Sequence, residues 1–173
     1  EKYVEIGDSV HFSSDFVTFG GTKIKAKAID DRFGCAVMLK MIESEPEYDT
    51  YFAFLVQEEV GCRGASVAAF TVKPDYAIVL EATTAADVAF VAEADSVCRQ
   101  GKGAVVSFMD RSTLYNRDMF KGAFKLAGEN NIPIQTKTTV AGGNDAGAIH
   151  KSNSGIYTIA VSLPCRYIHS STS

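Results

Sequence analysis

The sequence predicts an α/β fold, in which a layered sheet carries helices on both of its faces. Segments typical of strands alternate with segments typical of helices along most of the 173 residues, and this alternation is the signature of such a sheet. The length, together with 46% hydrophobic residues, suffices for one domain with a sizeable core. A second complete domain is therefore not expected.

The N-terminal part of the chain predicts two strands and a long helix. Residues 9–19 contain β-branched and aromatic side chains and end at a glycine pair, which is typical of a strand followed by a turn. Residues 23–28 alternate in character and predict a second strand. Asp30 or Asp31 can cap a helix that continues to residue 42, because the apolar residues that follow recur near helical period.

The later elements alternate as the fold class requires. The apolar run 50–56 predicts a buried strand, and residues 64–71 predict a short helix of small residues. The other predicted strands are residues 76–80, 105–109, 134–139 and 156–161, and the other predicted helices are residues 117–130 and a segment that begins within 143–151. Because α/β sheets deliver functional groups at the carboxyl ends of their strands, polar residues that follow these strands are the candidates for a site.

Composition excludes several classes of partner. The net charge of −4 and the pI near 5.4 provide no basic field for nucleic acid, and Lys and Arg are scattered along the chain. The longest apolar stretches are far shorter than the ~20 residues needed to cross a bilayer, and the polar start is unlike a signal peptide. We therefore expect a soluble cytoplasmic protein with no membrane partner.

The cysteines suggest neither a metal knuckle nor a disulfide framework. All four are widely spaced and form no C-x-x-C pair: Cys35, Cys62, Cys98 and Cys165. We expect them to be reduced and mostly buried. A catalytic cysteine is not favoured, since none has an obvious general-base histidine in its local sequence.

The most informative feature is the carboxylate pair Glu58 and Glu59, which ends the apolar run 50–56. Successive strand residues point to opposite sides, so one carboxylate can bind a cation while the other faces a reacting water. Mutual repulsion and partial burial would raise one pKa toward the value that a general base needs. Taken alone, such a pair is more typical of a solvated surface, and other parts of the chain decide between the two interpretations.

Further acidic or imidazole residues occupy the same kind of position. They follow strand-like runs or lie in a Gly-Gly-Asn-Asp turn: Asp30, Glu81, Asp145 and His169. Zinc or cobalt prefers carboxylate oxygen and imidazole nitrogen, and Asp30, Glu59, Glu81 and His169 supply that set and leave Glu58 free. A lone histidine at a strand end is more often structural, but the convergence of four strand ends favours a metal site.

Four motifs resemble the signatures of metallopeptidase family forty-two, the glutamyl and tetrahedral aminopeptidases, which are often labelled cellulase M or endoglucanase. The motifs are residues 27–34 (KAIDDRFG), 57–65 (QEEVGCRGA), 142–146 (GGNDA) and 164–170 (PCRYIHS), and the resemblance covers the whole chain in the right order. It implies a phosphorylase/hydrolase-like α/β/α sandwich of the zinc peptidase type, with a mixed sheet and an inserted β domain. It also implies a homo-oligomer that cleaves N-terminal residues from peptides.

The resemblance assigns a role to each candidate. Asp30 would bridge two metal ions, Glu81 would bind the first, and Glu59 and His169 would bind the second. Glu58 would be the general base for a water activated by both zinc or cobalt ions. A cis peptide bond between Asp30 and Asp31 is implied as well. Gly143 and Asp145 are the candidates for substrate binding.

One expected ligand of the family does not match. The upstream histidine motif is absent, since His11 lacks the family context and is expected on the surface, and His150 is expected to pack on a helix. We therefore expect an incomplete catalytic domain: residues 1–20 as a junction with a missing inserted domain and residues 21–173 as its partial catalytic part. Such a chain would hold at most one metal tightly and would itself be inactive.

Two other functions stay open. An endo-1,4-β-glucanase needs two carboxylates about 5 to 9.5 Å apart, which Glu58 and Glu81 could supply, but the chain has no tryptophan for sugar stacking. An inactive assembly module is the alternative that involves no enzyme.

Overall fold

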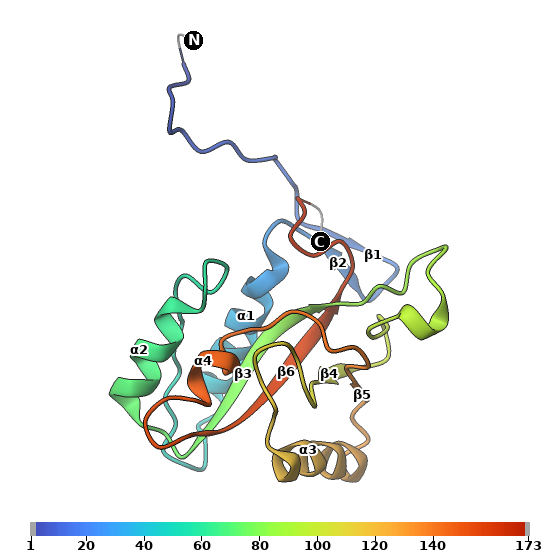
Figure 1. The fold of residues 1–173 in the computed structure, drawn as a ribbon. Helices are drawn as coiled ribbons and strands as arrows, with labels where there is room; N and C mark the ends of the chain where they lie inside the picture. The colour runs from blue at the N-terminus through green and yellow to red at the C-terminus, as the bar shows by residue number, and fades with distance from the viewer. Residues whose placement is uncertain (1–2, 172–173) are drawn as a thin grey trace.

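A mixed four-stranded sheet forms the centre of the protein (Figure 1), which the computed structural model describes for residues 3–171. The strand order is β3-β6-β4-β5. Their bounds are Tyr76–Thr84 for β3, Tyr157–Cys165 for β6, Ala104–Val106 for β4 and Ile134–Thr136 for β5. Strands β3 and β6 run parallel, β4 is antiparallel to β6, and β5 is parallel to β4. The predicted mixed sheet is therefore confirmed.

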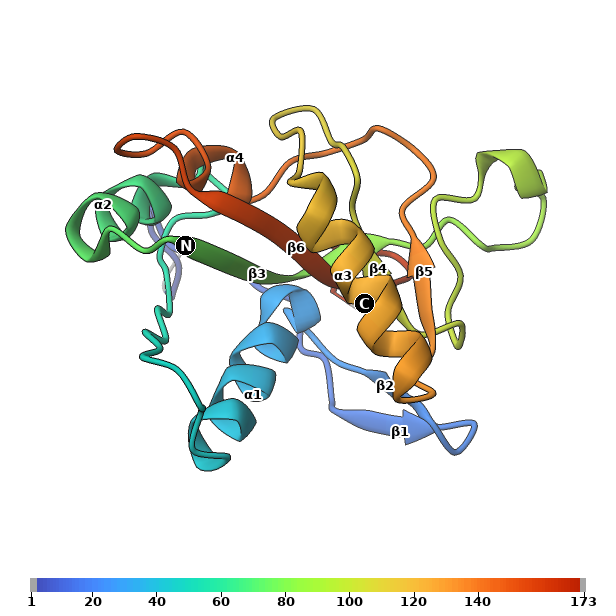
Figure 2. The ribbon, with the colours of Figure 1, turned by 90° about the horizontal axis from the view of Figure 1, so that it is seen from below.

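Helices pack on the two sides of β3 and β6. Their bounds are Ile29–Glu43 for α1, Arg63–Val72 for α2, Arg117–Glu129 for α3 and Ala146–Ile149 for α4, with a 3₁₀ turn, η1, at Glu93–Asp95. Figure 2 shows α1 on one side of β3 and β6, and α2 and α4 on the other. Helix α3 contacts β6. A separate antiparallel hairpin of β1 (Val17–Phe19) and β2 (Lys23–Lys25) lies on the α1 side.

Two buried clusters fix the elements that surround the site. The larger joins α2, α4, β3 and β6 mainly through small and medium side chains, with Tyr115 and Ile156 added from neighbouring segments: Ala65, Ala69, Val79, Tyr115, Ala146, Ile149, Ile156 and Ala160. Its alanines let the short helix α4 approach α2 closely, because only methyl groups separate the backbones. The smaller contains Ile29, Ala82 and Cys165 and holds the start of α1 against the ends of β3 and β6.

The prediction of a buried strand over residues 50–56 is wrong. The segment has no strand assignment, and Tyr51 and Val56 are 75% and 66% exposed. A strand requires hydrogen bonds to a neighbouring strand, and within residues 3–171 no strand pairs with this segment. Its apolar composition therefore predicted a pairing that the described residues do not contain.

Other predicted elements are present with different bounds. Four strands are shorter than predicted: β1, β2, β4 and β5, for which the predicted ranges were 9–19, 23–28, 105–109 and 134–139. Two strands are longer, since β3 continues beyond the predicted residue 80 to residue 84 and β6 beyond residue 161 to residue 165. Glu81 consequently lies inside β3, and Asp30 lies at the start of α1 instead of following a strand. The residue before α1 is Ala28, which makes no side-chain cap bond; inside α1, the Asp31 Oδ1 accepts the Gly34 amide hydrogen at the kink from which the regular helix continues.

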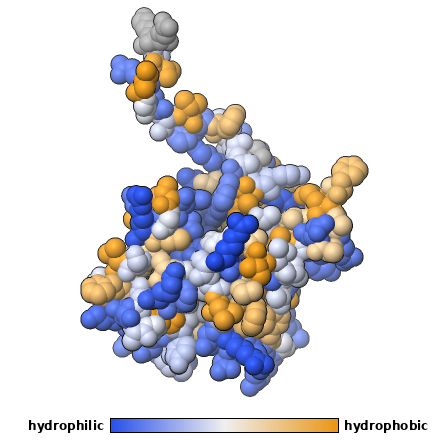
Figure 3. Space-filling view, viewed as in Figure 1, coloured by the Kyte–Doolittle hydropathy of each residue, from blue (hydrophilic) through white to orange (hydrophobic). Residues whose placement is uncertain are grey.

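The surface includes a projecting N-terminal segment, residues 3–16 (Figures 1 and 3), along which apolar side chains stand exposed. His11 lies in it and is exposed, as expected. The four cysteines carry no disulfide; Cys98 and Cys165 are buried, and Cys35 and Cys62 are half-buried. Among the helices of residues 3–171, none is long and apolar enough to span a bilayer.

Candidate metal centre

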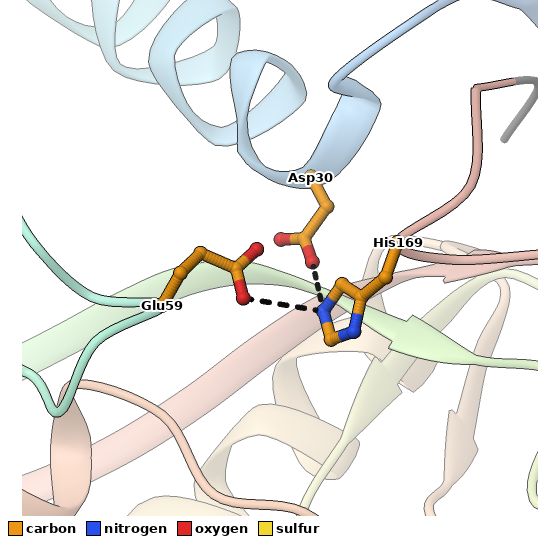
Figure 4. Close-up of side chains that lie close together, drawn as sticks. All are labelled: Asp30, Glu59 and His169. Carbon is orange, nitrogen blue, oxygen red and sulfur yellow. Dashed lines mark ion pairs between the residues drawn. The ribbon is translucent and has the colours of Figure 1, made fainter. Parts of the chain in front are cut away.

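Asp30, Glu59 and His169 meet at one point, although they are far apart in the sequence (Figure 4). The His169 Nε2 atom lies 3.1 Å from Asp30 Oδ2 and 3.5 Å from Glu59 Oε2. Ligands of a tetrahedral zinc ion at about 2.0 to 2.1 Å from the metal lie roughly 3.3 to 3.4 Å apart. The three side chains, which the sequence predicts as ligands, therefore come together at separations that a divalent cation would need.

Each of these ligands is delivered by a different local structure. Asp30 follows Ala28, whose left-handed backbone turns the chain into α1, and the predicted cis peptide bond joins Asp30 to Asp31. Glu59 lies in the turn before α2, and His169 lies in the turn after β6. The Asp30 side chain is only 13% exposed, while those of Glu59 and His169 are 60% and 63% exposed. The cluster thus has a buried base and an open rim.

A second group of carboxylates shares Asp30 with the first. Asp30, Asp31 and Glu81 bring one oxygen each to within 4.8 Å of one another. Burial, together with Asp30 and Asp31, raises the pKa of Glu81 to about 9, and burial is the main cause that raises the pKa of Asp31 to about 7. A cation would relieve this crowding of carboxylates. Asp30 stands in both groups, which is the position that a bridging ligand requires.

Glu58 stands beside the first group without belonging to it. Its carbonyl oxygen accepts the amide hydrogens of Gly61 and Cys62, which fixes the turn before α2. Burial raises the pKa of the Glu58 carboxyl, and Asp145, Glu59 and Asp30 raise it further. Such an environment favours a proton acceptor over a permanently solvated charge.

A cleft of about 580 Å³ joins these residues to a basic side. The acidic side contains Asp30, Glu58, Glu59 and Glu81 with His169, and the opposite lining includes Ser112, Lys137, Lys151 and residues 142–144. The Lys137 Nζ donates to the Ala141 carbonyl oxygen at 2.7 Å, and burial lowers the pKa of its amine. Within residues 3–171, no carboxylate forms an ion pair with Lys137.

The Gly-Gly-Asn-Asp turn is held by a buried polar network. Asp110 accepts the Tyr115 hydroxyl hydrogen and the backbone amide hydrogens of Ser112 and Thr113, and the Asn144 amide donates to the Tyr115 oxygen. A Cβ atom on Gly143 would lie 2.7 Å from Ser112 Oγ, so any other residue there would require the Ser112 side chain to move. Gly143 lines the cleft, whereas Asp145 is buried and absent from the lining.

His169 is positioned by an ion pair between Arg166 and Asp87. The Arg166 Nε donates to Asp87 Oδ1 at 2.8 Å, and its Nη2 donates to the Asp87 carbonyl oxygen at 3.0 Å. With a third bond from Nη2 to Asp87 Oδ2 at 3.2 Å, this contact joins the turn after β6 to the loop after β3. The guanidinium lowers the pKa of the Asp87 carboxyl. His150 follows the last residue of α4 and does not belong to the metal groups. Its Nδ1 contacts the Ala146 carbonyl oxygen at the start of that helix, as expected for a side chain that packs on a helix.

The substitution Asp87→Asn should destabilise the fold in a pH-dependent way. We expect the free energy of unfolding at neutral pH to fall by about 1.5 to 3 kcal/mol, because a hydrogen-bonded charge is lost. The Asp87 pKa is lower in the folded state than its ordinary 3.8, so the wild-type advantage exists above that value and is lost as the pH falls through the lowered pKa.

Urea unfolding at neutral pH and at about pH 3 measures this difference. The matched control is Glu93→Gln, which breaks the exposed pair with Arg99 and should change stability by less than about 1 kcal/mol. The role given to the ion pair would be contradicted if both substitutions lowered the free energy of unfolding equally. It would also be contradicted if the stability difference between the wild type and Asp87→Asn were as large at about pH 3 as at neutral pH.

Three residues of the site were missed by the sequence analysis as site residues. Asp31 was considered only as a helix cap, and its place beside Asp30 was the available signal. Cys62 contacts Glu58, with its Sγ 3.7 Å from Glu58 Oε1. Lys137 directly follows β5, the edge strand opposite β3, and lines the cleft. Nothing in its local sequence distinguishes it from a surface lysine.

Comparison with known proteins identifies relatives along the whole chain. The family profile described as M42 glutamyl aminopeptidase matches residues 1–173. A putative aminopeptidase of Acetivibrio thermocellus is 43% identical over 98% of this chain, which covers 51% of that protein. The chain thus spans about half the length of the curated relatives it matches.

Solved structures show the same fold. An aminopeptidase of the archaeon Desulfurococcus kamchatkensis superposes with a TM-score of 0.89 at 32% identity, over 93% of this chain and 46% of its own. The TET1 peptidase of Pyrococcus horikoshii, described as assembling into a tetrahedron or an octahedral shell, gives 0.75 at 32% identity over 93% and 47%. A protein of Thermotoga maritima described as an endoglucanase gives 0.74 at 36% identity over 99% and 50%. The chain belongs to the M42 glutamyl aminopeptidase family of metallopeptidases.

Proposed function

We propose that this chain carries the metal ligands and the general base of a metal-dependent aminopeptidase, which releases N-terminal residues from peptides. The observation that carries the proposal is the meeting of Asp30, Glu59 and His169 at ligand separations beside Glu58. Asp30 and Glu81 with Asp31 would hold a second cation. Two divalent ions, when bound, would acidify a water and polarise the scissile carbonyl.

Glu58 performs the proton transfers in this proposal. Its carboxylate takes a proton from the attacking water and then gives it to the nitrogen of the leaving amine. Burial and the neighbouring carboxylates, which raise the pKa of Glu58, support this role. Asp30 lies between the two groups and would fix the separation of the ions, which is about 3.5 to 4 Å in two-metal sites.

The two groups should differ in affinity. The group of Asp30, Glu59 and His169 contains an imidazole, whereas that of Asp30, Asp31 and Glu81 contains carboxylates alone. We propose that zinc or cobalt is held tightly by the first group and weakly by the second, so that this chain retains at most one ion and has little activity by itself. Metal analysis after desalting would measure this ratio, and two retained ions would contradict it.

Lys137 is proposed to select the substrate's N-terminal side chain. The strand order places β3 and β5 three strand spacings apart, and the registers place Gln135 level with Glu81 and Lys137 two residues further on. The backbones of Glu81 and Lys137 therefore lie roughly 16 Å apart. This leaves room for one amino acid side chain between the metal groups and the lysine amine. A half-buried amine without an anionic partner in the described residues favours an acidic side chain there.

The substitution Lys137→Met tests this selection in the complete enzyme. We expect kcat/KM for glutamyl anilides to fall roughly 10- to 100-fold, because a charged hydrogen bond is lost, while kcat/KM for leucyl anilides stays within a factor of a few. The matched control is Lys102→Met, a lysine that is exposed and absent from the cleft lining. A parallel loss for both substrates would assign Lys137 a structural role.

The endoglucanase alternative rests on the description of the Thermotoga maritima neighbour. It would need Glu81 as a free acid, and Asp30 and Asp31 beside it favour a cation in that place. Hydrolysis of amino-acid anilides against cello-oligosaccharides, measured in the presence and absence of a chelator, separates the two activities. Activity toward the sugar that resists the chelator would overturn the aminopeptidase proposal.

Assembly is the third part of the proposal. Homologous TET peptidases are described as dodecameric, tetrahedral and octahedral particles, and we propose that the complete enzyme is likewise a homo-oligomer acting on peptides. If the protein is instead an assembly module without catalysis, the complete protein should bind no metal and should not hydrolyse anilides. The cytoplasmic location expected from the sequence stays a prediction, as do the junction at residues 1–20 and the partial catalytic domain over 21–173.

A further inference from the structure

Glu58, Cys62 and Asp145 form a third group of potential ligands, beside the two groups described above and without a residue in common with them. One atom of each side chain lies within 4.8 Å of one atom of the others. Glu58 and Cys62 line the cleft, whereas Asp145 lies beneath them and is 8% exposed. The proposed aminopeptidase mechanism gives no role to the thiol or to the Asp145 carboxyl.

The spacing within this group matches the ligand shell of a zinc ion. The Cys62 Sγ lies 3.7 Å from Glu58 Oε1. A tetrahedral zinc ion, with sulfur at about 2.3 Å and oxygen at about 2.0 to 2.2 Å, places these two ligands roughly 3.6 Å apart. The Cys62 thiol donates a hydrogen bond to Glu58 across this separation, and a zinc ion that replaces the thiol proton would leave the two atoms about as far apart.

Asp145 supplies an independent sign that a ligand belongs here. Its Oδ1 atom is fully buried and accepts no hydrogen bond within the part of the chain that the structure describes, and the side-chain partner of its carboxyl group is the Cys62 thiol within the same group. Nor do Lys, Arg or His side chains among residues 3–171 form an ion pair with Glu58 or Asp145. A buried carboxylate oxygen without a partner is costly, and a cation between the three side chains would remove that cost.

We propose that Glu58, Cys62 and Asp145 form a third cation site, selective for thiophilic divalent ions such as zinc and cadmium. Sulfur with two carboxylate oxygens favours these ions over magnesium or calcium. The ion enters through the cleft, the thiol proton passes to solvent, and a metal–sulfur bond forms in its place. An ion at this site occupies the Glu58 carboxylate, so excess zinc inhibits the enzyme; this consequence rests on the proposed function.

Cadmium titration of the 173-residue chain, followed by the ultraviolet charge-transfer absorbance of the cadmium–thiolate bond, tests the site directly. We expect the wild-type signal to saturate at one cadmium-bound thiolate per chain. The substitution Cys62→Ser should abolish the signal, and Asp145→Asn should weaken binding at least tenfold. The matched control is Cys35→Ser, which changes another half-buried thiol and should leave the signal intact.

The result is independent of the main metal centre. His169→Ala should leave the thiolate absorbance unchanged, so failure of the proposed catalytic centre and failure of this site are distinguishable. If Cys62→Ser does not fold, alkylation of the wild-type thiols followed by peptide mapping provides the test. We expect cadmium to slow the alkylation of Cys62 at least tenfold. A signal that survives in Cys62→Ser, equal affinity in Asp145→Asn, or an absent wild-type signal with unprotected Cys62 would overturn the proposal.

Discussion

Replacing Glu58 with Gln is expected to abolish turnover in the complete enzyme while metal content stays unchanged. The amide is nearly isosteric with the carboxylate, but it cannot accept a proton at neutral pH. A positioned general base contributes about 10²- to 10⁴-fold, so kcat for an amino-acid anilide should fall at least about 100-fold. Parallel metal analysis and rate measurement on the same preparation check both parts of the prediction.

The adjacent substitution Glu59→Gln is the matched control. Glu59 Oε2 lies 3.5 Å from His169 Nε2 within the candidate metal group, whereas Glu58 lies outside that group. We therefore expect Glu59→Gln to lose metal and activity together. Equal metal loss in the two variants would mean that the roles of the two neighbouring carboxylates are assigned wrongly.

Replacing His169 with Ala is expected to have the largest effect on metal binding. The histidine supplies the sole imidazole among the metal groups found in residues 3–171. Loss of residues that merely support metal ligands typically costs 10- to 100-fold in affinity, so loss of this ligand should lower zinc affinity by more than about 100-fold. Competition titration of zinc against a chromophoric chelator measures the change.

His150→Ala serves as the control for that titration. His150 is half-buried at the end of α4, and its ring contacts the Ala146 carbonyl oxygen instead of the carboxylate groups. Zinc affinity should remain within a factor of about two in this variant. A comparable loss in both variants would show that the zinc ion is bound elsewhere or that histidine replacement disturbs the fold in general.

The elements that could be predicted from sequence are those whose stabilising contacts are local or lie within the described chain. Helix α3 begins at residue 117, as predicted, because the Asn116 side chain accepts the amide hydrogens of Asp118 and Met119. Strands β3 and β6 are apolar and pair with each other. The run 50–56 looks equally strand-like, but most of its apolar side chains are exposed, and within residues 3–171 no strand pairs with it. Local composition cannot reveal whether a partner strand is present.

The candidate site divides in the same way. Glu59 and His169 could be predicted because the motifs that contain them resemble those of a known family, and the structure brings them to Asp30. Asp31, Cys62 and Lys137 could not, because their place in the site depends on how α1, the turn before α2 and the chain after β5 are arranged in space. Ordinary residue types acquire their role there from distance and burial, which the sequence does not encode locally.

Anomalous diffraction from crystals of this chain grown with one equivalent of zinc tests the central claim most directly. We predict that the strongest peak lies among Asp30, Glu59 and His169, about 2.0 to 2.1 Å from the His169 Nε2. Its position would identify the ligands without reference to activity. A chain that binds zinc with its strongest peak elsewhere, and with no density between these three side chains, would contradict the account.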